Sequence, residues 1–304
     1  MLDMRRLRLL REVHARGTVH AAAHALGYSP SAISQQLAVL EREAGTALLE
    51  RVGRNVRLTP AGRVLVRHAG TLLEAMEAAE AELASVAAGQ VAGSVRVAAF
   101  QSAFLRIIAP AVRALALSHP HVRVEATEAE VQVAVPALRL QQLDMLVGDQ
   151  YEGQPRPVHP ELHRELLLRE QIRVVLPIDH SQARADRVPI RRLSELAWAA
   201  SQPDTGHHAM QLRICRQFGG FEPDLRYSSD DFLIQLELVR STGAGALLPD
   251  LALGRSPGGV AIRPLAEGPI GREIFLLTRR SRTPAVEAVA AAVRSAAALA
   301  HGTP

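Results

Sequence analysis

The sequence predicts a multidomain α/β protein: a helix-rich N-terminal module, a long linker helix and a two-lobed α/β body. The chain has 304 residues, enough for two or three domains. Its 48% apolar and 3% aromatic content is typical of a globular protein and excludes disorder as the main state. Positive charge is concentrated at one end. Residues 1–67 hold 11 Arg against five acidic residues, a net charge of +6, whereas the rest of the chain carries −2 and the whole chain +4. This asymmetry favours a nucleic-acid-facing module on a neutral body.

The first element is an amphipathic helix. Its apolar positions recur at every third residue: Met4, Leu7, Leu10 and Val13. We expect the arginines between them to face water: Arg5, Arg8 and Arg11.

Two more helices follow with a short turn between them. Thr18 can cap an Ala-rich helix that Gly27 ends, and Ser29 and Pro30 then begin a third helix as N-cap and first helical residue. The apolar positions of this third helix predict its buried face: Ile33, Leu37 and Leu40. Polar residues near its start are then turned outward: Ser31, Ser34 and Gln35. The pair has helix-turn-helix geometry.

In that geometry the N-terminal end of the second helix enters the DNA major groove. Gln35 can bind adenine through two hydrogen bonds, Ser31 can pair with several bases, and Pro30 can touch a thymine methyl. Residues 48–59 predict a basic hairpin wing whose arginines hold phosphates or a minor groove. The predicted DNA contacts are Thr18, Ser29, Pro30, Ser31, Ser34, Gln35, Arg51, Arg54 and Arg57.

Residues 59–92 predict a long helix and a hinge. After Pro60 no proline interrupts the chain until beyond Ala88, and apolar residues recur at helical intervals: Leu65, Leu72, Leu73, Met76, Ala79 and Leu83. An apolar stripe of this kind needs a partner, so we expect the chain to associate with itself. Gly-containing residues 87–93 are expected to form the hinge.

The body, residues 93–304, alternates strand-like and helical segments, which predicts α/β lobes with a largely parallel sheet. Strands are expected at 94–100, 122–126, 143–148, 166–168, 172–177, 243–249 and 272–278. Helices are expected at 105–117, 230–240 and 284–300. The predicted lobe limits are about 93–163 with 269–304 for lobe I, and about 164–268 for lobe II. Two lobes leave a cleft between them.

The N-terminal residues resemble the DNA-binding domain of LysR-type transcriptional regulators. The matching pattern covers about 60 residues: Gly17-Thr18, Ala21 to Ala23, Leu26, Ser29 to Ser34, Leu40-Glu41, Gly45, Leu48 to Arg51 and Leu58 to Gly62. Leu49 departs from the usual Phe, and Pro30 from the common polar residue. The resemblance implies double-stranded promoter or operator DNA as partner, a homodimer or homotetramer with paired linker helices, and a periplasmic-binding-protein-like body whose cleft takes a small-molecule effector.

Several polar residues are candidates for contact with that effector. Gln101 and Ser102 follow the first strand of the body and open a helix, where free N–H groups can accept an anion. The alternative for Ser102 is a simple helix cap. Asp149 ends another strand and would face the same cleft. In lobe II the candidates are Ser201, Gln202, Thr205, Ser228 and Ser229.

No metal, cofactor or catalytic site is predicted. His207 and His208 are neighbours in a Gly-containing segment, which we expect to be a loop with both side chains at the surface. His20 and His24 have ligand spacing but no third ligand. The single cysteine, Cys215, is expected to be a buried thiol. Spacing alone shows no catalytic constellation, so we do not expect an enzyme.

Location and function complete the prediction. No apolar stretch reaches the length of a membrane span, and the N-terminus lacks a secretion signal, so we expect a cytoplasmic protein. The favoured function is a sequence-specific transcription regulator that a small effector modulates. The alternative is a constitutive architectural protein that binds DNA with weak specificity, and the two differ in whether a ligand alters DNA binding.

Overall fold

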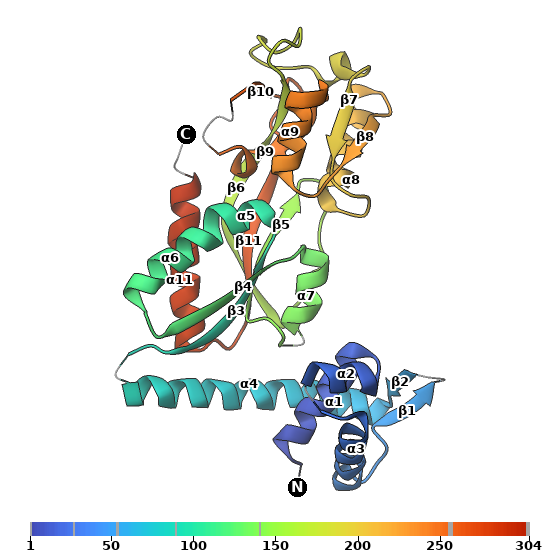
Figure 1. Cartoon of the computed structure of the whole chain (residues 1–304), viewed down its shortest axis with the longest axis vertical. Coiled ribbons are helices and arrows are strands. Elements are labelled where there is room, and N and C mark those ends of the chain that lie inside the picture. The colour runs from blue at the N-terminus through green and yellow to red at the C-terminus, as the bar shows by residue number, and fades with distance from the viewer. Residues whose placement is uncertain are drawn as a thin grey trace.

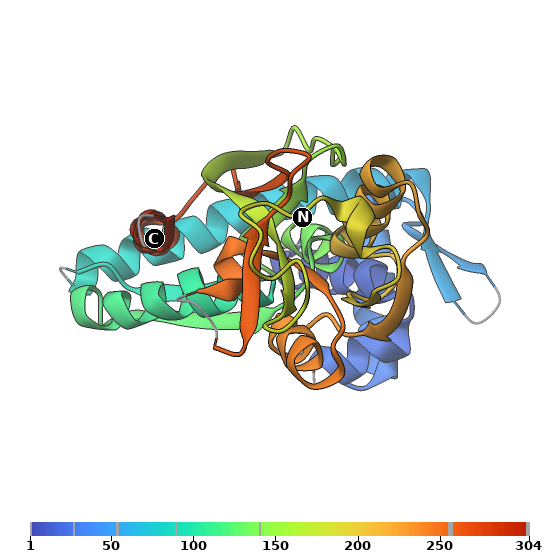
Figure 2. The same cartoon turned by 90° about the horizontal axis from the view of Figure 1, so that it is seen from above.

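The computed structural model describes residues 2–26, 28–52, 55–88, 90–139, 141–254 and 258–301. A small helical module lies at one end of the molecule, and an elongated body lies beyond it (Figure 1). Helix α4 (Pro60–Ala88) extends from the module across the base of the body, as the view from above shows (Figure 2). None of the described helices combines the length and apolarity needed to cross a bilayer.

The module contains three helices, α1 (Met4–Arg16), α2 (Val19–Leu26) and α3 (Pro30–Ala44). Their start signals act as predicted. The Thr18 hydroxyl accepts from the Ala21 N–H at 3.1 Å, and the Ser29 hydroxyl accepts from the Ala32 N–H at 3.2 Å. The predicted apolar face of α3 is buried in a common core with α1: Ile33, Leu37, Leu40, Leu7, Leu10 and Val13.

Strands β1 (Leu49–Val52) and β2 (Asn55–Leu58) form the antiparallel wing. Leu49, where the family pattern usually has Phe, packs partly buried against the module core. A Cβ at Gly62 would lie 2.1 Å from the Leu48 carbonyl oxygen, so the start of α4 can approach the wing only with glycine there. The predicted turn residue Arg54 lies outside the described residues, as does the side chain of Arg51.

One expectation for α1 is wrong. Arg5 and Arg8 are exposed, but Arg11 is 7% exposed, and its Nη1 donates to the side-chain oxygen of Gln141 in the body. The apolar residues at every third position of α1 show only which side of the helix packs inside the module. The body covers the side of α1 on which Arg11 lies. The partner of Arg11, Gln141, is 130 positions away in the chain, so the spacing within α1 could not indicate this contact.

The body is built on a seven-stranded sheet in the order β10-β6-β11-β5-β3-β4, with β9 paired to β6. Its strands are β3 (Gly93–Ala99), β4 (Val122–Glu128), β5 (Met145–Tyr151), β6 (Leu162–Pro177), β9 (Ala246–Pro249), β10 (Val260–Pro264) and β11 (Gly271–Arg279). β3 pairs with β4 and β5 in parallel, and the other pairings are antiparallel. The sheet is therefore mixed, and the expectation of a largely parallel sheet is wrong.

β6 is one continuous strand through both lobes. Residues 162–171 pair with β11 in lobe I, and residues 172–177 pair with β9 and β10 in lobe II. The predicted limit between the lobes, near residue 163, therefore falls inside this strand.

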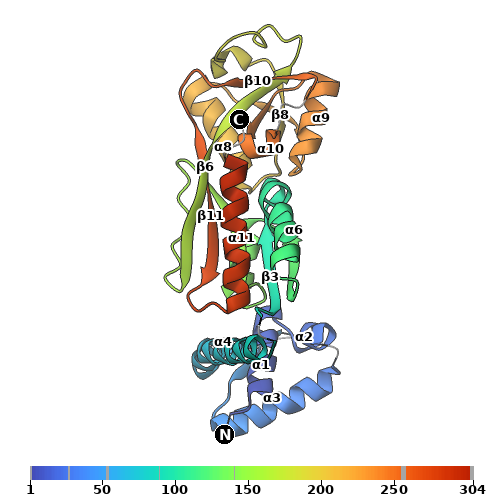
Figure 3. The same ribbon diagram turned by 90° about the vertical axis from the view of Figure 1, so that its left-hand side faces the viewer.

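Helices cover the lobe I part of the sheet. A continuous helical stretch consists of α5 (Gln101–Ala103), η1 (Phe104–Ile108) and α6 (Ala109–Ser118), and it lies beside α11 (Pro284–His301) on one face (Figure 3). Helix α7 (Val131–Arg139), which periodicity did not predict, packs on the other face through Val131, Ala134 and Leu138.

Lobe II adds a second small sheet, β7 (Ala197–Ala200) with β8 (Asp224–Ser228). Its helices are η2 (Ile190–Leu193), α8 (Gly206–Ile214), η3 (Cys215–Gly219), α9 (Phe232–Thr242) and α10 (Asp250–Leu253). The core contains Trp198 and Cys215, both fully buried. Burial raises the pKa of the Cys215 thiol to about 12, as befits the inert buried thiol that was predicted.

Candidate functional site

The start of α3 presents polar side chains to solvent. Ser31, Ser34 and Gln35 are exposed, and the side-chain amide of Gln35 makes no hydrogen bond to any described residue. The Ser29 and Ser31 hydroxyls lie 3.0 Å apart at the helix N-terminus. The amide of Gln35 is therefore available to the edge of a base, and the two hydroxyls and the positive end of the helix dipole are available to a phosphate.

The wing carries a charge pair. Arg57 Nε lies 2.9 Å from Glu50 Oε1, and both side chains are largely exposed. An exposed pair contributes only about 0–1 kcal/mol, so Arg57 can exchange Glu50 for a phosphate at little cost.

The predicted apolar stripe of α4 is only partly covered. Leu73 is buried, whereas Leu72 and Met76 are each 48% exposed and Leu83 is 70% exposed. Leu72 and Met76 are four residues apart and so lie on one face of the helix. The described chain leaves an apolar surface on α4 without cover.

The cleft between the lobes is organised around Arg272, which lies at the start of β11 opposite Glu170 of β6. Arg272 is only 2% exposed. Its Nε donates to Glu170 Oε1 at 2.6 Å, and its Nη1 donates to Asp149 Oδ2 at 3.0 Å and to the Tyr151 hydroxyl at 3.1 Å. Nη2 donates to the Ser102 hydroxyl at 2.9 Å. Ser102 is therefore a partner of a buried cation, and the helix-cap alternative is wrong.

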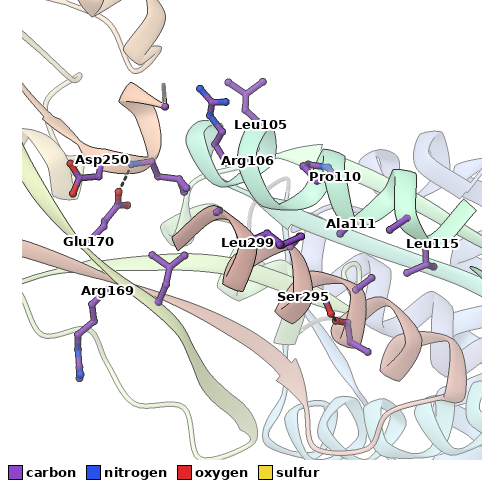
Figure 4. A pocket seen from close by; sticks show the side chains of 18 of the residues that line it. Leu105, Arg106, Pro110, Ala111, Leu115, Arg169, Glu170, Asp250, Ser295 and Leu299 are labelled. Carbon is purple, nitrogen blue, oxygen red and sulfur yellow. Dashed lines mark hydrogen bonds between the residues drawn. The ribbon is translucent and has the colours of Figure 1, made fainter. Parts of the chain in front are cut away.

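The carboxylates around Arg272 have further donors. Glu170 also accepts from the backbone N–H of Leu251, a contact drawn as a dashed line in Figure 4. Asp149 also accepts from Arg156 Nη2 at 3.2 Å. Burial lowers the pKa of Arg272, but Glu170 and the other acidic neighbours more than offset this, so its pKa is raised and the guanidinium stays charged.

The lobe II wall of the cleft is a buried polar network around His207. Contrary to expectation, His207 is 4% exposed and lies in helix α8, not in a surface loop; its neighbour His208 is half-buried. Since the Leu247 carbonyl can only accept, His207 Nε2 carries the proton and donates to it at 2.6 Å. His207 Nδ1 then accepts from the Ser201 hydroxyl at 3.0 Å. Burial lowers the pKa of His207 to about 4, so the ring is neutral.

The network continues behind His207. Gln235 Nε2 donates to the Ser201 hydroxyl at 3.3 Å and to the Ser229 carbonyl at 2.6 Å. Both ring nitrogens of His207 are engaged in this network, so the ring cannot bind a metal without breaking it. Among the described residues no group of three or more His, Cys, Asp or Glu is placed to hold a metal ion.

A direct contact joins the lobes across the cleft mouth. Gln101 Nε2, from lobe I, donates at 2.8 Å to Oδ1 of Asp231, the N-cap residue of α9 in lobe II. The cavity that Gln101 lines between the lobes has a volume of about 20 Å³, which is room for about one water molecule. Side chains thus fill this part of the cleft, and a wider hollow of about 530 Å³ adjoins it at Tyr151, Thr205 and Gly206.

The structure brings half of the predicted effector residues to the cleft: Gln101, Asp149, Ser201 and Thr205. Ser102 lies one layer behind, on Arg272. Gln202, Ser228 and Ser229 lie outside the lining, where the Gln202 N–H donates to Asp230 and Ser228 is exposed at the end of β8. Sequence reasoning missed other lining residues: Phe100, Glu130, Tyr151, Asp230, Phe232 and Arg272.

Glu130 is the unusual carboxyl in the cleft. Burial, and then the carboxylates of Asp149 and Asp230, raise its pKa from 4.5 to about 7. Because the folded protein holds this proton more tightly than the unfolded chain does, stability falls as the pH rises from 4.5 to about 7. The charged form is therefore the destabilising one.

We expect Glu130→Gln to raise the melting temperature by about 5 °C at about pH 8 and to leave it unchanged at about pH 5. Thermal scans of both proteins at the two pH values measure this. Glu128→Gln, on the exposed end of β4, is the matched control and should have no effect at either pH. An equal shift at both pH values would show that the charge of Glu130 is not the cause.

A larger hollow of about 1040 Å³ lies outside the cleft (Figure 4). It is lined mainly by apolar residues of α6, α10 and α11, with Arg106 and Asp250 at one end. Glu170 forms part of its wall, so it abuts the Arg272 cluster from the other side. None of the predicted effector residues lines it.

Comparison with known proteins matches both parts of the chain. Residues 4–63 match the family described as bacterial regulatory helix-turn-helix protein, lysR family, and residues 88–298 match the LysR substrate binding domain. The small neutral protease regulatory protein of Streptomyces lividans is 30% identical over 295 residues, covering 94% of this chain and 80% of that protein. The transcriptional dual regulator GltC of Bacillus subtilis is 26% identical over 252 residues, covering 82% and 81%.

Solved structures resemble the whole chain. A variant of full-length OxyR from Pseudomonas aeruginosa has a TM-score of 0.72 at 21% identity, covering 97% of this chain and 95% of that one. CbnR complexed with its target DNA has a TM-score of 0.57 at 22% identity, covering 97% and 100%. At these identities the likeness establishes the fold.

Proposed function

Because the chain belongs to the LysR family of transcriptional regulators, we propose that it reads an operator with α3 and that a small polar effector in the inter-lobe cleft modulates this binding. The family and the fold class predicted from the sequence are confirmed by these matches. We propose that the protein acts in the cytoplasm on double-stranded DNA, as a homodimer or homotetramer. Its proposed domains are residues 1–58, 59–92 and 93–304.

The exposed start of α3 supports the DNA part of the proposal. The proposed contacts are the nine residues named from the sequence: Thr18, Ser29, Pro30, Ser31, Ser34, Gln35, Arg51, Arg54 and Arg57. Among these, Gln35 supplies base discrimination, since its amide has a free donor and acceptor and lies on the exposed face of α3. The arginines supply affinity that falls as the salt concentration rises.

We expect Gln35→Ala to reduce the preference for the best operator over single-base variants by about 1–3 kcal/mol, and to change binding to unrelated DNA little. Competition binding against a set of operator variants measures this. Gln36→Ala is the matched control. The side chain of Gln36, unlike that of Gln35, has a partner within the module, because it accepts a hydrogen bond from Arg6 of α1 at 3.4 Å. If Gln35→Ala leaves every operator ranking unchanged, another residue reads the bases.

The single observation that carries the effector part is the cleft lined by polar groups from both lobes. Asp149, Gln101 and Glu130 face it from lobe I, and Thr205 and Asp230 face it from lobe II. An effector that separates the lobes at Gln101 and Asp231 breaks their contact and replaces it with its own bonds to both lobes. Only an effector that favours one lobe arrangement over the other can change DNA binding, typically by about 1–3 kcal/mol.

The test is retention of fragments of the source genome on the purified protein across a salt series, followed by sequencing. A few dyad-symmetric sites that survive moderate salt support the proposal, and genes beside these sites narrow the choice of effector. Uniform retention that disappears with salt would favour the architectural alternative. No retention would overturn the DNA part.

A further inference from the structure

Gln141 joins the body to the DNA-binding module. It is 2% exposed, its Nε2 donates to the Gly70 carbonyl oxygen of α4 at 2.6 Å, and its Oε1 accepts from Arg11 of α1. A Cβ at Gly70 would lie 3.5 Å from Gln141 Nε2, an ordinary van der Waals distance, so the bond comes from the position of the helix backbone and not from glycine there. One side chain thus contacts both α1 of the module and the linker helix α4, which pack on each other.

The backbone of Gln141 is held in an uncommon conformation. Its φ is 61°, a left-handed value that few residues other than glycine adopt. Such a residue persists where its surroundings hold it in place. Here the two side-chain contacts and the N–H bond to the Leu138 carbonyl at 3.2 Å supply that restraint.

Gln141 is also tied to the effector cleft, through α7. This helix begins immediately after Glu130, whose side chain lines the cleft and whose carbonyl accepts from the N–H groups of Val133 and Ala134 at 3.0 and 2.9 Å. It ends at Arg139, two residues before Gln141. In Figure 1, α7 runs from below α8 down toward the N-terminal helical module.

The helix can transmit displacement because it is firmly packed along one side. Val131, Ala134 and Leu138 are buried against the sheet, in one cluster with Leu146 and Phe275. Pro136 removes one internal hydrogen bond of this nine-residue helix, but Ala134 and Leu138 on either side of it pack into the same cluster and so hold the two halves together. Hydrogen bonds at its far end depend steeply on distance and angle, so a small shift changes them more than it changes an apolar contact.

We propose that α7 couples the cleft to the DNA-binding module and that Gln141 is the positioning residue that sets the module against the body. When the groups around Glu130 rearrange, α7 shifts, and the bonds of Gln141 to Arg11 and Gly70 strengthen or break. This inference rests on the proposed function only in taking an effector as the natural cause of that rearrangement.

The test is hydrogen–deuterium exchange on the full chain without DNA or ligand. Gln141→Gly removes the side chain and keeps a residue suited to the left-handed backbone. Peptides from α1 and from α4 around Gly70 are expected to exchange about tenfold faster, while α9 in lobe II is unchanged. Gln142→Gly is the matched control and should leave α1 and α4 as they are. Unchanged exchange in α1 and α4 of Gln141→Gly would overturn the positioning role.

A second arm tests the coupling. At about pH 8, Glu130→Gln removes the repulsion at the cleft end of α7, so exchange in α7 should slow. In the wild-type background the slowing should extend to α1, and in the Gln141→Gly background it should stop at α7. Slowing of α1 in both backgrounds, or in neither, would overturn the coupling. Because no DNA or effector is present, this outcome is independent of whether operator binding or effector binding fails.

Discussion

Arg272→Ala is expected to lower the melting temperature of the body by about 10 °C, the equivalent of about 3–5 kcal/mol. The reason is what the substitution leaves behind. Glu170 and Asp149 would remain buried with their main cationic partner gone, and Tyr151 and Ser102 would each lose a donor. Removing one member of a buried ionic cluster costs far more than the cluster contributes as a whole.

The fluorescence of Trp198 can report this unfolding, because it is the single tryptophan and lies fully buried in lobe II. Arg169→Ala is the matched control. Arg169 also pairs with a carboxylate on β11, Glu273, but its side chain is 70% exposed, so the expected shift is at most about 2 °C.

A second variant distinguishes the loss of side-chain packing from the effect of buried carboxylates left without a cation. Combining Arg272→Met with Glu170→Gln and Asp149→Asn removes the buried charges together, and we expect it to recover part of the loss. If the single variant melts like the wild type, Arg272 does not hold the cleft together.

The N-terminal module was predictable because its signals are local. Ser29 and Pro30 determine where α3 begins through contacts within four residues, and the spacing of Ile33, Leu37 and Leu40 determines which face is buried. The family pattern rests on the same short-range features. The long helix α4 was predictable for the same reason, since no proline interrupts it.

The cleft was only partly predictable because its chemistry is assembled from distant segments. Arg272 lies in a strand-like run of apolar residues and looks like any exposed strand arginine, yet its partners are 102 to 170 positions away in sequence. Helix α8 contains Gly206 and two histidines and lacks a clear apolar face, so the sequence predicts a loop at His207 and His208. Glu130 gave no signal, because only tertiary packing places α7 with its first turn at the cleft.

Replacing Leu72 and Met76 of α4 with Glu is expected to give a monomer that binds its operator about 100-fold more weakly. Both side chains are half-exposed on one helix face, and the described chain supplies no cover for them. If α4 pairs with a second copy along this face, two glutamates from each chain would be buried next to one another, at a cost that abolishes association.

The loss of affinity follows from the loss of the second half-site. When two modules are linked, the second contact is made at a high effective concentration, which accounts for roughly a hundredfold of the affinity for a dyad. A monomer keeps its α3 and its wing, so its affinity for a single half-site should match that of the wild type. Analytical ultracentrifugation gives the mass, and titration of labelled duplexes with one or two half-sites gives the affinities.

Val158→Glu is the matched control, since Val158 is 88% exposed in a loop of the body far along the chain from α4. It should leave both mass and affinity unchanged. A double variant that remains a dimer with wild-type affinity would show that the exposed face of α4 is not the contact between chains. A double variant that becomes a monomer but keeps its affinity for the full dyad would instead show that the two half-sites are not read by paired modules.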